Sequence, residues 1–140
     1  MRCGDTLLFD ADVIVPDIEI DSSATPNLHL WIVITEPRPP DFQCVIVSVT
    51  TQKPHSDATV VLRPGDHPFI TRDSVIQYLD ARFADARGLD DIIEKGLAKR
   101  RDSCSPELLE RIQDGVGHSR FLPKKFVAYC NERLKRGQIG

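Results

Sequence analysis

Residues 28–35 read Leu-His-Leu-Trp-Ile-Val-Ile-Thr, and residues 44–51 read Cys-Val-Ile-Val-Ser-Val-Thr-Thr. β-Branched and aromatic residues fill both stretches, and such residues favour the pleated, buried surface of a sheet. Residues 36–40 between them, Glu-Pro-Arg-Pro-Pro, must turn or run as polyproline, because proline cannot donate to a strand ladder. The two stretches therefore predict two central strands joined by a proline-rich connection.

Three further stretches favour strands. Residues 6–9 follow a Gly-Asp turn, and residues 58–62 form a short run that ends before an Arg-Pro-Gly turn. Residues 74–83 fit neither the helical nor the strand period cleanly, and we favour a strand there. Residues 10–27 hold five acidic residues, no basic residue and two prolines, which predicts a long loop with an edge strand at residues 13–15.

The last third of the chain favours helices. Residues 88–97 predict a short helix, and a second begins at Ser105, which suits the capping position, before Pro106 at the first helical position. A final helix begins at Pro123. The apolar stripes of these last two helices recur every four residues, as Leu108, Ile112 and Val116 and then as Phe126, Cys130 and Leu134.

Strands followed by helices predict an α+β fold. We expect one domain over residues 1–140, mainly strands in 1–87 and mainly helical in 88–140. A small curled antiparallel sheet or barrel would carry two to three packed helices, most of them C-terminal.

The composition is that of an ordinary globular domain, with 140 residues, 41% hydrophobic and 28% charged. The longest apolar run, residues 28–35, is far shorter than the roughly 20 residues that span a membrane, and no apolar signal core follows Met1. The four cysteines form no Cys-x-x-Cys pair and have no zinc spacing. We therefore expect a cytoplasmic protein with free thiols, no membrane partner, no metal and no cofactor.

Charge is divided unevenly along the chain. Residues 95–140 carry 11 Lys/Arg against 5 Asp/Glu, a formal charge of +6, whereas residues 1–94 carry 7 against 16, a charge of −9. The split predicts an acidic body with a basic, helical C-terminal part. The basic part is either a nucleic-acid stripe or a set of solvated helix faces attracted to the acidic body.

The order of five short segments resembles the PemK/MazF-like toxin family. Gly-Asp-Thr-Leu at residues 4–7 resembles the family's opening strand, and residues 29–34 lie where the family has an Arg-Pro followed by an apolar strand. The valine-rich run at 45–51 resembles its strand ending in a threonine loop. Residues 70–75 with Ala81 and Arg82 resemble its Ser-Val and arginine region, and residues 105–109 its closing helix. The likeness spans about residues 4–118 and implies an SH3-like barrel with added helices.

The resemblance also implies an activity. Members of this family are endoribonucleases of toxin–antitoxin pairs, which act as homodimers on single-stranded RNA without a metal. Single-stranded RNA, an antitoxin-like protein and a second copy of the chain are therefore the expected partners. Cleavage of this type needs a base for the ribose 2′-hydroxyl, a donor for the leaving oxygen and positive charge near the phosphoryl oxygens.

Residue by residue, the resemblance assigns the catalytic positions. Thr50 matches the family's reactive threonine, and His29 stands where the family has its catalytic arginine. A histidine can serve as acid or base near neutral pH but lacks the guanidinium fork that grips a phosphate. Asp80 and Arg82 fall in the region of the remaining catalytic residues.

Five further residues are candidates for substrate binding: Thr51, Lys53, His55, His67 and Tyr78. His67 lies in a Pro-Gly-Asp-His-Pro loop, where Arg63, Asp66 and His67 form either an acid–base cluster or a turn whose aspartate bonds its own backbone. We favour the turn. Tyr78 is either a core residue or an exposed ring on which an RNA base stacks.

Two other functions stay open. The missing arginine at position 29 and the acidic body favour a catalytically diverged, non-enzymatic module on the same barrel, which binds a protein partner or nucleic acid. The basic C-terminal part alone suggests a DNA-associated module, whose affinity would fall steeply with salt.

Overall fold

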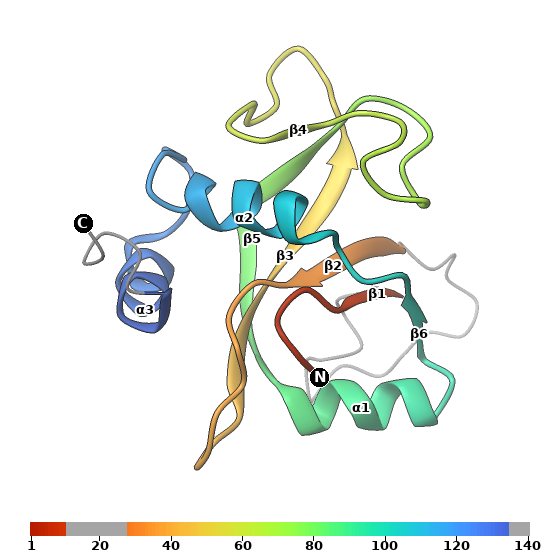
Figure 1. Ribbon diagram of the computed structural model, residues 1–140, viewed down its shortest axis with the longest axis vertical. Coiled ribbons are helices and arrows are strands. Elements are labelled where there is room, and N and C mark those ends of the chain that lie inside the picture. The colour runs from red at the N-terminus through yellow and green to blue at the C-terminus, as the bar shows by residue number, and fades with distance from the viewer. Residues whose placement is uncertain (11–27, 135–140) are drawn as a thin grey trace.

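The computed structural model describes residues 1–10 and 28–134. Its six strands form one antiparallel sheet in the order β4-β5-β3-β2-β1-β6. The strands are β1 (Thr6–Phe9), β2 (His29–Val33), β3 (Gln43–Thr51), β4 (Val61–Leu62), β5 (Ser74–Asp85) and β6 (Ala98–Arg101). The helices are α1 (Ala86–Glu94), α2 (Pro106–Gly115) and α3 (Lys124–Leu134). The sheet curls into a half-barrel, so the fold is α+β as predicted (Figure 1).

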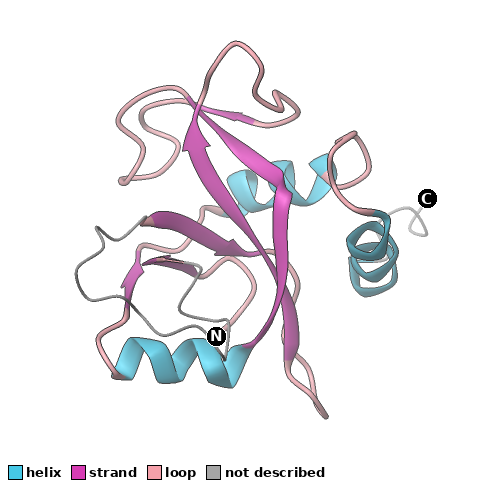
Figure 2. Cartoon of the chain, turned by 180° about the vertical axis from the view of Figure 1, so that it is seen from behind, coloured by secondary structure: helices cyan, strands magenta, loops and turns pink. Residues whose placement is uncertain are grey.

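The sheet curls where β5 is irregular. Ser48 pairs with Gln77, but Ile46 pairs with Arg82, so residues 78–81 of β5 stand opposite a single residue of β3. Extra residues on one strand bend it and increase its twist. The same irregularity explains why the sequence of this stretch follows no single period, and the strand that we favoured there is confirmed. Figure 2 shows β3 and β5 crossing the molecule as its two longest strands.

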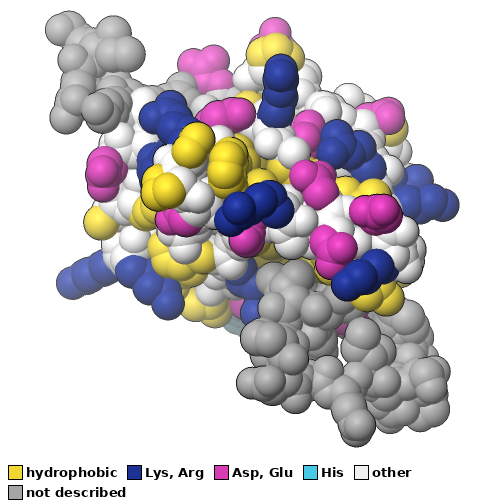
Figure 3. All heavy atoms as spheres, turned by 90° about the horizontal axis from the view of Figure 1, so that it is seen from below, with side chains coloured by type: hydrophobic (Ala, Val, Ile, Leu, Met, Phe, Trp, Pro, Cys, Tyr) yellow, Lys and Arg dark blue, Asp and Glu magenta, His cyan; other side chains and the backbone are white. Residues whose placement is uncertain are grey.

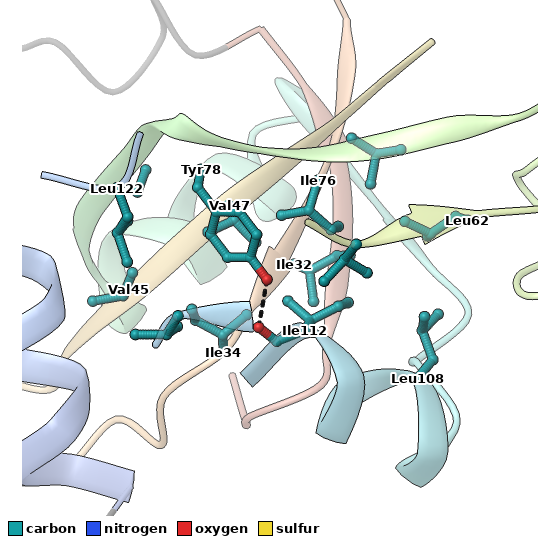
Figure 4. Packing of buried hydrophobic residues seen from close by; sticks show 14 of the residues in the cluster. Ile32, Ile34, Val45, Val47, Leu62, Ile76, Tyr78, Leu108, Ile112 and Leu122 are labelled. Atoms are coloured by element: carbon teal, nitrogen blue, oxygen red, sulfur yellow. Dashed lines mark hydrogen bonds between the residues drawn. The ribbon is translucent and has the colours of Figure 1, made fainter. Parts of the chain in front are cut away.

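Alternate residues of the strands feed two apolar clusters. The larger cluster joins one face of β3 to the helices α2 and α3. Its members include Val45, Val47 and Val49 of β3, Leu108 and Ile112 of α2, and Phe126 and Cys130 of α3. Figure 4 shows this packing, in which the fully buried Tyr78 donates a hydrogen bond from its hydroxyl to the Ile112 carbonyl oxygen, 2.6 Å away. The smaller cluster is formed by alternate residues of the same strands against Leu89 and Ile92 of α1.

Helix α1 differs from its predicted bounds at both ends. It begins at Ala86 rather than Gly88, because the Asp85 side chain accepts a hydrogen bond from the Arg87 N–H and caps it. It ends at Glu94, two residues before Gly96, whose positive φ of 78° is a conformation that glycine adopts readily. The helix predicted from Ser105 is confirmed, with Ser105 as its cap.

Two strands differ more from expectation. The stretch predicted at residues 58–62 is a strand only at Val61 and Leu62, because Thr59 bonds to Asp57 instead of joining the ladder. Residues 98–101, expected within a helical part, form β6 and pair with β1. The edge strand predicted at residues 13–15 lies outside the described residues.

The described surface mixes charges. Figure 3 shows lysine and arginine interspersed with aspartate and glutamate on the face seen from below, which therefore presents no basic stripe. None of the helices in the described residues is long and apolar enough to cross a membrane. Within the same residues, no three His, Cys, Asp or Glu side chains lie close enough to hold a metal ion, and all four cysteines are free thiols.

Candidate functional site

A cavity of about 670 Å³ opens where β2 begins and β3 ends. The loop that joins β4 to β5, residues 63–73, supplies a second wall, and the end of β6 supplies a third. We call it the main cavity. Its polar lining gathers two imidazoles, four hydroxyls, two guanidinium groups and one carboxylate: His29 and His67; Thr50, Thr51, Thr71 and Ser74; Arg72 and Arg101; and Asp102.

His29 and Thr50 are neighbours on adjacent strands. The antiparallel register pairs Leu30 with Val49, so His29, which precedes Leu30, stands opposite Thr50, which follows Val49. His29 is half-buried, and its Nδ1 lies 3.3 Å from the Val49 carbonyl oxygen. A carbonyl oxygen only accepts, so in the tautomer that this contact favours Nδ1 donates to Val49 and Nε2 is the acceptor nitrogen. That tautomer would let Nε2 accept a proton.

His67 uses both of its ring nitrogens within the protein. It is 4% exposed, its Nδ1 accepts a hydrogen bond from the Phe69 N–H at 3.0 Å, and its Nε2 donates to the Asp102 carbonyl oxygen. The predicted substrate contact is thus a positioning residue, which ties the Phe69 loop to the end of β6. The turn that we favoured around it is present, because the Asp66 carboxylate accepts from the Arg63 N–H at 2.8 Å. That backbone hydrogen bond is also the main cause that lowers the pKa of Asp66.

Arg72 and Arg101 bring positive charge to the cavity. Both side chains are exposed, and within the described part of the chain no carboxylate forms an ion pair with either of them. The Arg101 guanidinium lies over the ring of Phe69, 5.8 Å from its centre. The sequence analysis placed neither arginine in the candidate site. Arg72 belonged to a motif of the family resemblance, and Arg101 to the basic C-terminal part that was considered as a nucleic-acid stripe.

A second cavity, of about 490 Å³, adjoins the first. Thr50 and Thr51 line both cavities. Lys53 and His55, predicted to bind substrate, line only the second cavity and are exposed there. The second cavity has an apolar wall formed by Leu79 and Phe121.

Three of the predicted site residues line neither cavity. Tyr78 is fully buried, and its burial raises the pKa of the phenol, so it belongs to the core and offers no ring for stacking. Asp80 is exposed and accepts a hydrogen bond from the Gln77 amide at 2.7 Å. Arg82 pairs with Ile46, four residues from Thr50 along β3, or roughly 13 Å. Its guanidinium lies 5.8 Å from the centre of the Trp31 ring, away from the cavity.

The structure therefore brings His29, Thr50, Thr51 and His67 together and separates them from Asp80 and Arg82. In comparisons with known proteins, no family model matches the chain. No curated protein matches it either.

Proposed function

We propose that the chain is a PemK/MazF-like, metal-independent endoribonuclease on an SH3-like barrel, and that it cleaves single-stranded RNA in the main cavity. The observation that carries the proposal is the convergence of His29 and Thr50 with Arg72 and Arg101 in one cavity. These are the group types that the reaction needs: a proton acceptor, a hydroxyl donor and positive charge.

In the proposed reaction the ribose 2′-oxygen attacks the adjacent phosphorus. His29 Nε2 takes the proton of the 2′-hydroxyl as the bond from the 2′-oxygen to phosphorus forms. The bond from phosphorus to the 5′-oxygen breaks, and this oxygen takes a proton from solvent. The products are a 2′,3′-cyclic phosphate and a free 5′-hydroxyl.

The two arginines take the part that a guanidinium at position 29 would otherwise play. Negative charge grows on the phosphoryl oxygens during the attack, and exposed guanidinium groups that form no ion pair within residues 1–10 and 28–134 suit contact with it. Thr50 supplies a neutral hydroxyl donor at the end of β3. The catalytic set is thus His29, Thr50, Arg72 and Arg101, and it differs from the set that the resemblance alone implied.

The test is cleavage of a long single-stranded RNA by purified protein in EDTA. We expect cuts that leave a cyclic phosphate. His29→Ala should slow them by roughly 10²- to 10⁴-fold, as for loss of a general base. Arg101→Gln should slow them by up to roughly 10²- to 10³-fold, as for loss of a transition-state donor.

Asp80→Asn is the matched control, because it changes a residue that the resemblance marks as catalytic but that lines neither cavity. It should leave the rate unchanged. An RNA that stays intact at high protein concentration would refute the proposal, and so would cleavage that depends on Asp80 but not on His29.

One observation favours a second candidate, a barrel module that binds without cleaving. Position 29 holds no arginine, whereas the exposed cations and the half-exposed Phe69 ring of the main cavity suit binding alone. Binding of a 2′-O-methyl RNA, with no cleavage of the matching RNA, would select this candidate.

A further inference from the structure

The second cavity lies directly across the end of β3 from the main cavity. Thr50 pairs with Val75 and Thr51 pairs with Ser74 in the sheet. Ser74 lines the main cavity, and Val75 lines the second cavity. Thr50 and Thr51 each line both cavities. The paired ends of β3 and β5 therefore form a ridge, which we call the threonine ridge, with a cavity on each side.

Each cavity presents an exposed phenylalanine. Phe69 on the main cavity is 38% exposed, and Phe121 on the second is 49% exposed. Each ring has a cation in the same cavity: Arg101 lies over Phe69, and Lys53 shares the second cavity with Phe121. An exposed aromatic ring beside a cation is the combination by which proteins hold an unpaired base and its phosphate.

The backbone at Phe121 is held by a chain of hydrogen bonds. The Phe121 backbone N–H donates to the Ser119 hydroxyl at 3.1 Å, and that hydroxyl donates to the Asp57 carboxylate at 2.7 Å. The other oxygen of Asp57 accepts from the N–H and the hydroxyl of Thr59. Asp57 lines the cavity, and both of its oxygens are engaged in these hydrogen bonds, which tie the backbone at Phe121 to the loop that carries Lys53.

We propose that the second cavity binds the nucleotide on the 3′ side of the cleaved bond, with its base against Phe121. The proposal rests on the proposed ribonuclease function. His29, which takes the proton of the attacking 2′-hydroxyl, lines only the main cavity, so that cavity holds the nucleotide on the 5′ side, next to Phe69. The phosphate between the two nucleotides then lies over the threonine ridge, and the nucleoside that leaves occupies the second cavity.

The experiment measures binding of labelled 2′-O-methyl oligoribonucleotides, which cannot be cleaved because the 2′-hydroxyl is blocked. A dinucleotide should bind more tightly than either of its mononucleotides. Phe121→Ala should weaken the dinucleotide by roughly 5- to 150-fold, as expected for the loss of one base–ring stack. Phe121→Trp should restore the affinity, because a larger ring keeps the stack.

Two sets of controls test which cavity binds the 5′ nucleotide and which binds the 3′ nucleotide. A dinucleotide that lacks its 3′ base should bind the wild-type protein with the weakened affinity that the complete dinucleotide shows for Phe121→Ala. Because this ligand has no base to stack on Phe121, the Phe121→Ala substitution should not weaken its binding further. A dinucleotide without its 5′ base should respond in the same way to Phe69→Ala. Leu97→Ala removes a side chain that is 42% exposed but lines neither cavity, and it should leave every affinity unchanged.

The outcomes separate this inference from the proposed function. If Phe121→Ala binds and cleaves RNA as well as the wild-type protein does, the subsite is refuted and the proposed ribonuclease activity still stands. Dinucleotide binding that depends on Phe121, in a protein that does not cleave RNA, would support the subsite and refute the activity. Wild-type protein that binds no oligonucleotide would overturn the inference, and the exposed Phe121 would then be a surface for a protein partner.

Discussion

Gly115 ends helix α2 directly against Tyr78, and replacing it by alanine tests the packing of the larger apolar cluster. A Cβ added at this position would overlap the Tyr78 hydroxyl oxygen and lie 2.8 Å from Val60 Cγ2 and 2.9 Å from Tyr78 Cζ. Real Cβ atoms essentially never come so close to other heavy atoms, so the Tyr78 ring must move. The ring is fully buried in the larger apolar cluster, so its neighbours must shift with it.

Two effects of Gly115→Ala lower the free energy of unfolding, and one effect raises it. Overpacking a well-filled core costs about 1–3 kcal/mol. Moving the ring also breaks the hydrogen bond from Tyr78 to the Ile112 carbonyl and leaves buried polar groups unpaired, which costs about 1–3 kcal/mol. Alanine is preferred to glycine within a helix by about 1 kcal/mol. We therefore expect Gly115→Ala to lower the free energy of unfolding by about 1–5 kcal/mol.

Urea unfolding followed by fluorescence measures this change, since the single tryptophan, Trp31, is buried in the sheet. Gly117→Ala is the matched control, because the nearest atom to its added Cβ is the Asp114 carbonyl oxygen at 3.8 Å. In a Tyr78→Phe background the overlapping oxygen is gone, so Gly115→Ala should cost less there. An unfolding midpoint for Gly115→Ala equal to that of the wild type would refute this account of the packing.

Two further predictions concern stability. Ser105→Ala removes the acceptor of the Leu108 N–H at 3.1 Å and should cost about 1 kcal/mol in urea unfolding, whereas a cost near zero would contradict the capping role. Burial raises the pKa of the Cys44 and Cys130 thiols from 9.0 to about 12, so the folded state keeps protons that the unfolded state loses. Stability is therefore fully present below pH 9 and should fall as the pH rises from 9 towards 12, and urea midpoints that stay constant over this range would contradict the prediction.

The elements that the sequence predicts are those with local signals. Strands β1, β2 and β3 are dense in β-branched or large apolar residues, and α2 has a serine cap, a proline and a regular stripe, so each is specified by its own residues. Strand β6 is not, because Ala-Lys-Arg-Arg is short and mostly charged. It becomes a strand only by pairing with β1, whose residues lie 89 to 95 positions earlier in the chain. Non-local pairing of this kind leaves no periodic signal in the sequence.

The residues of the candidate site likewise differ in whether the sequence alone could bring them together. His29 and Thr50 lie on strands that are consecutive in the chain, so their proximity follows from a simple antiparallel register. Arg72 and Arg101 reach the same cavity from a loop and from β6, which requires the three-dimensional fold. Arg82 lies apart from the threonine ridge because it pairs with Ile46, four residues from Thr50 along β3, a register that is set by the irregularity at residues 78–81. The order of motifs along the sequence does not contain that register.

The alternation of side chains along β6 reconciles the acidic body with the RNA substrate that we propose. Successive residues of a strand point to opposite faces, so neighbouring arginines on β6 have different surroundings. Arg100 forms ion pairs with Asp5 at 3.4 Å and with Asp90 at 3.7 Å, whereas Arg101 faces Phe69 and the main cavity. Asp66 and Asp73 on the neighbouring loop are likewise paired, with Arg111 and Arg63. Several acids of the body are thus neutralised at close range, while Arg72 and Arg101 form no ion pair in the part of the chain that the structure describes. The charges that matter for binding are therefore set by local pairing rather than by the net charge of the chain.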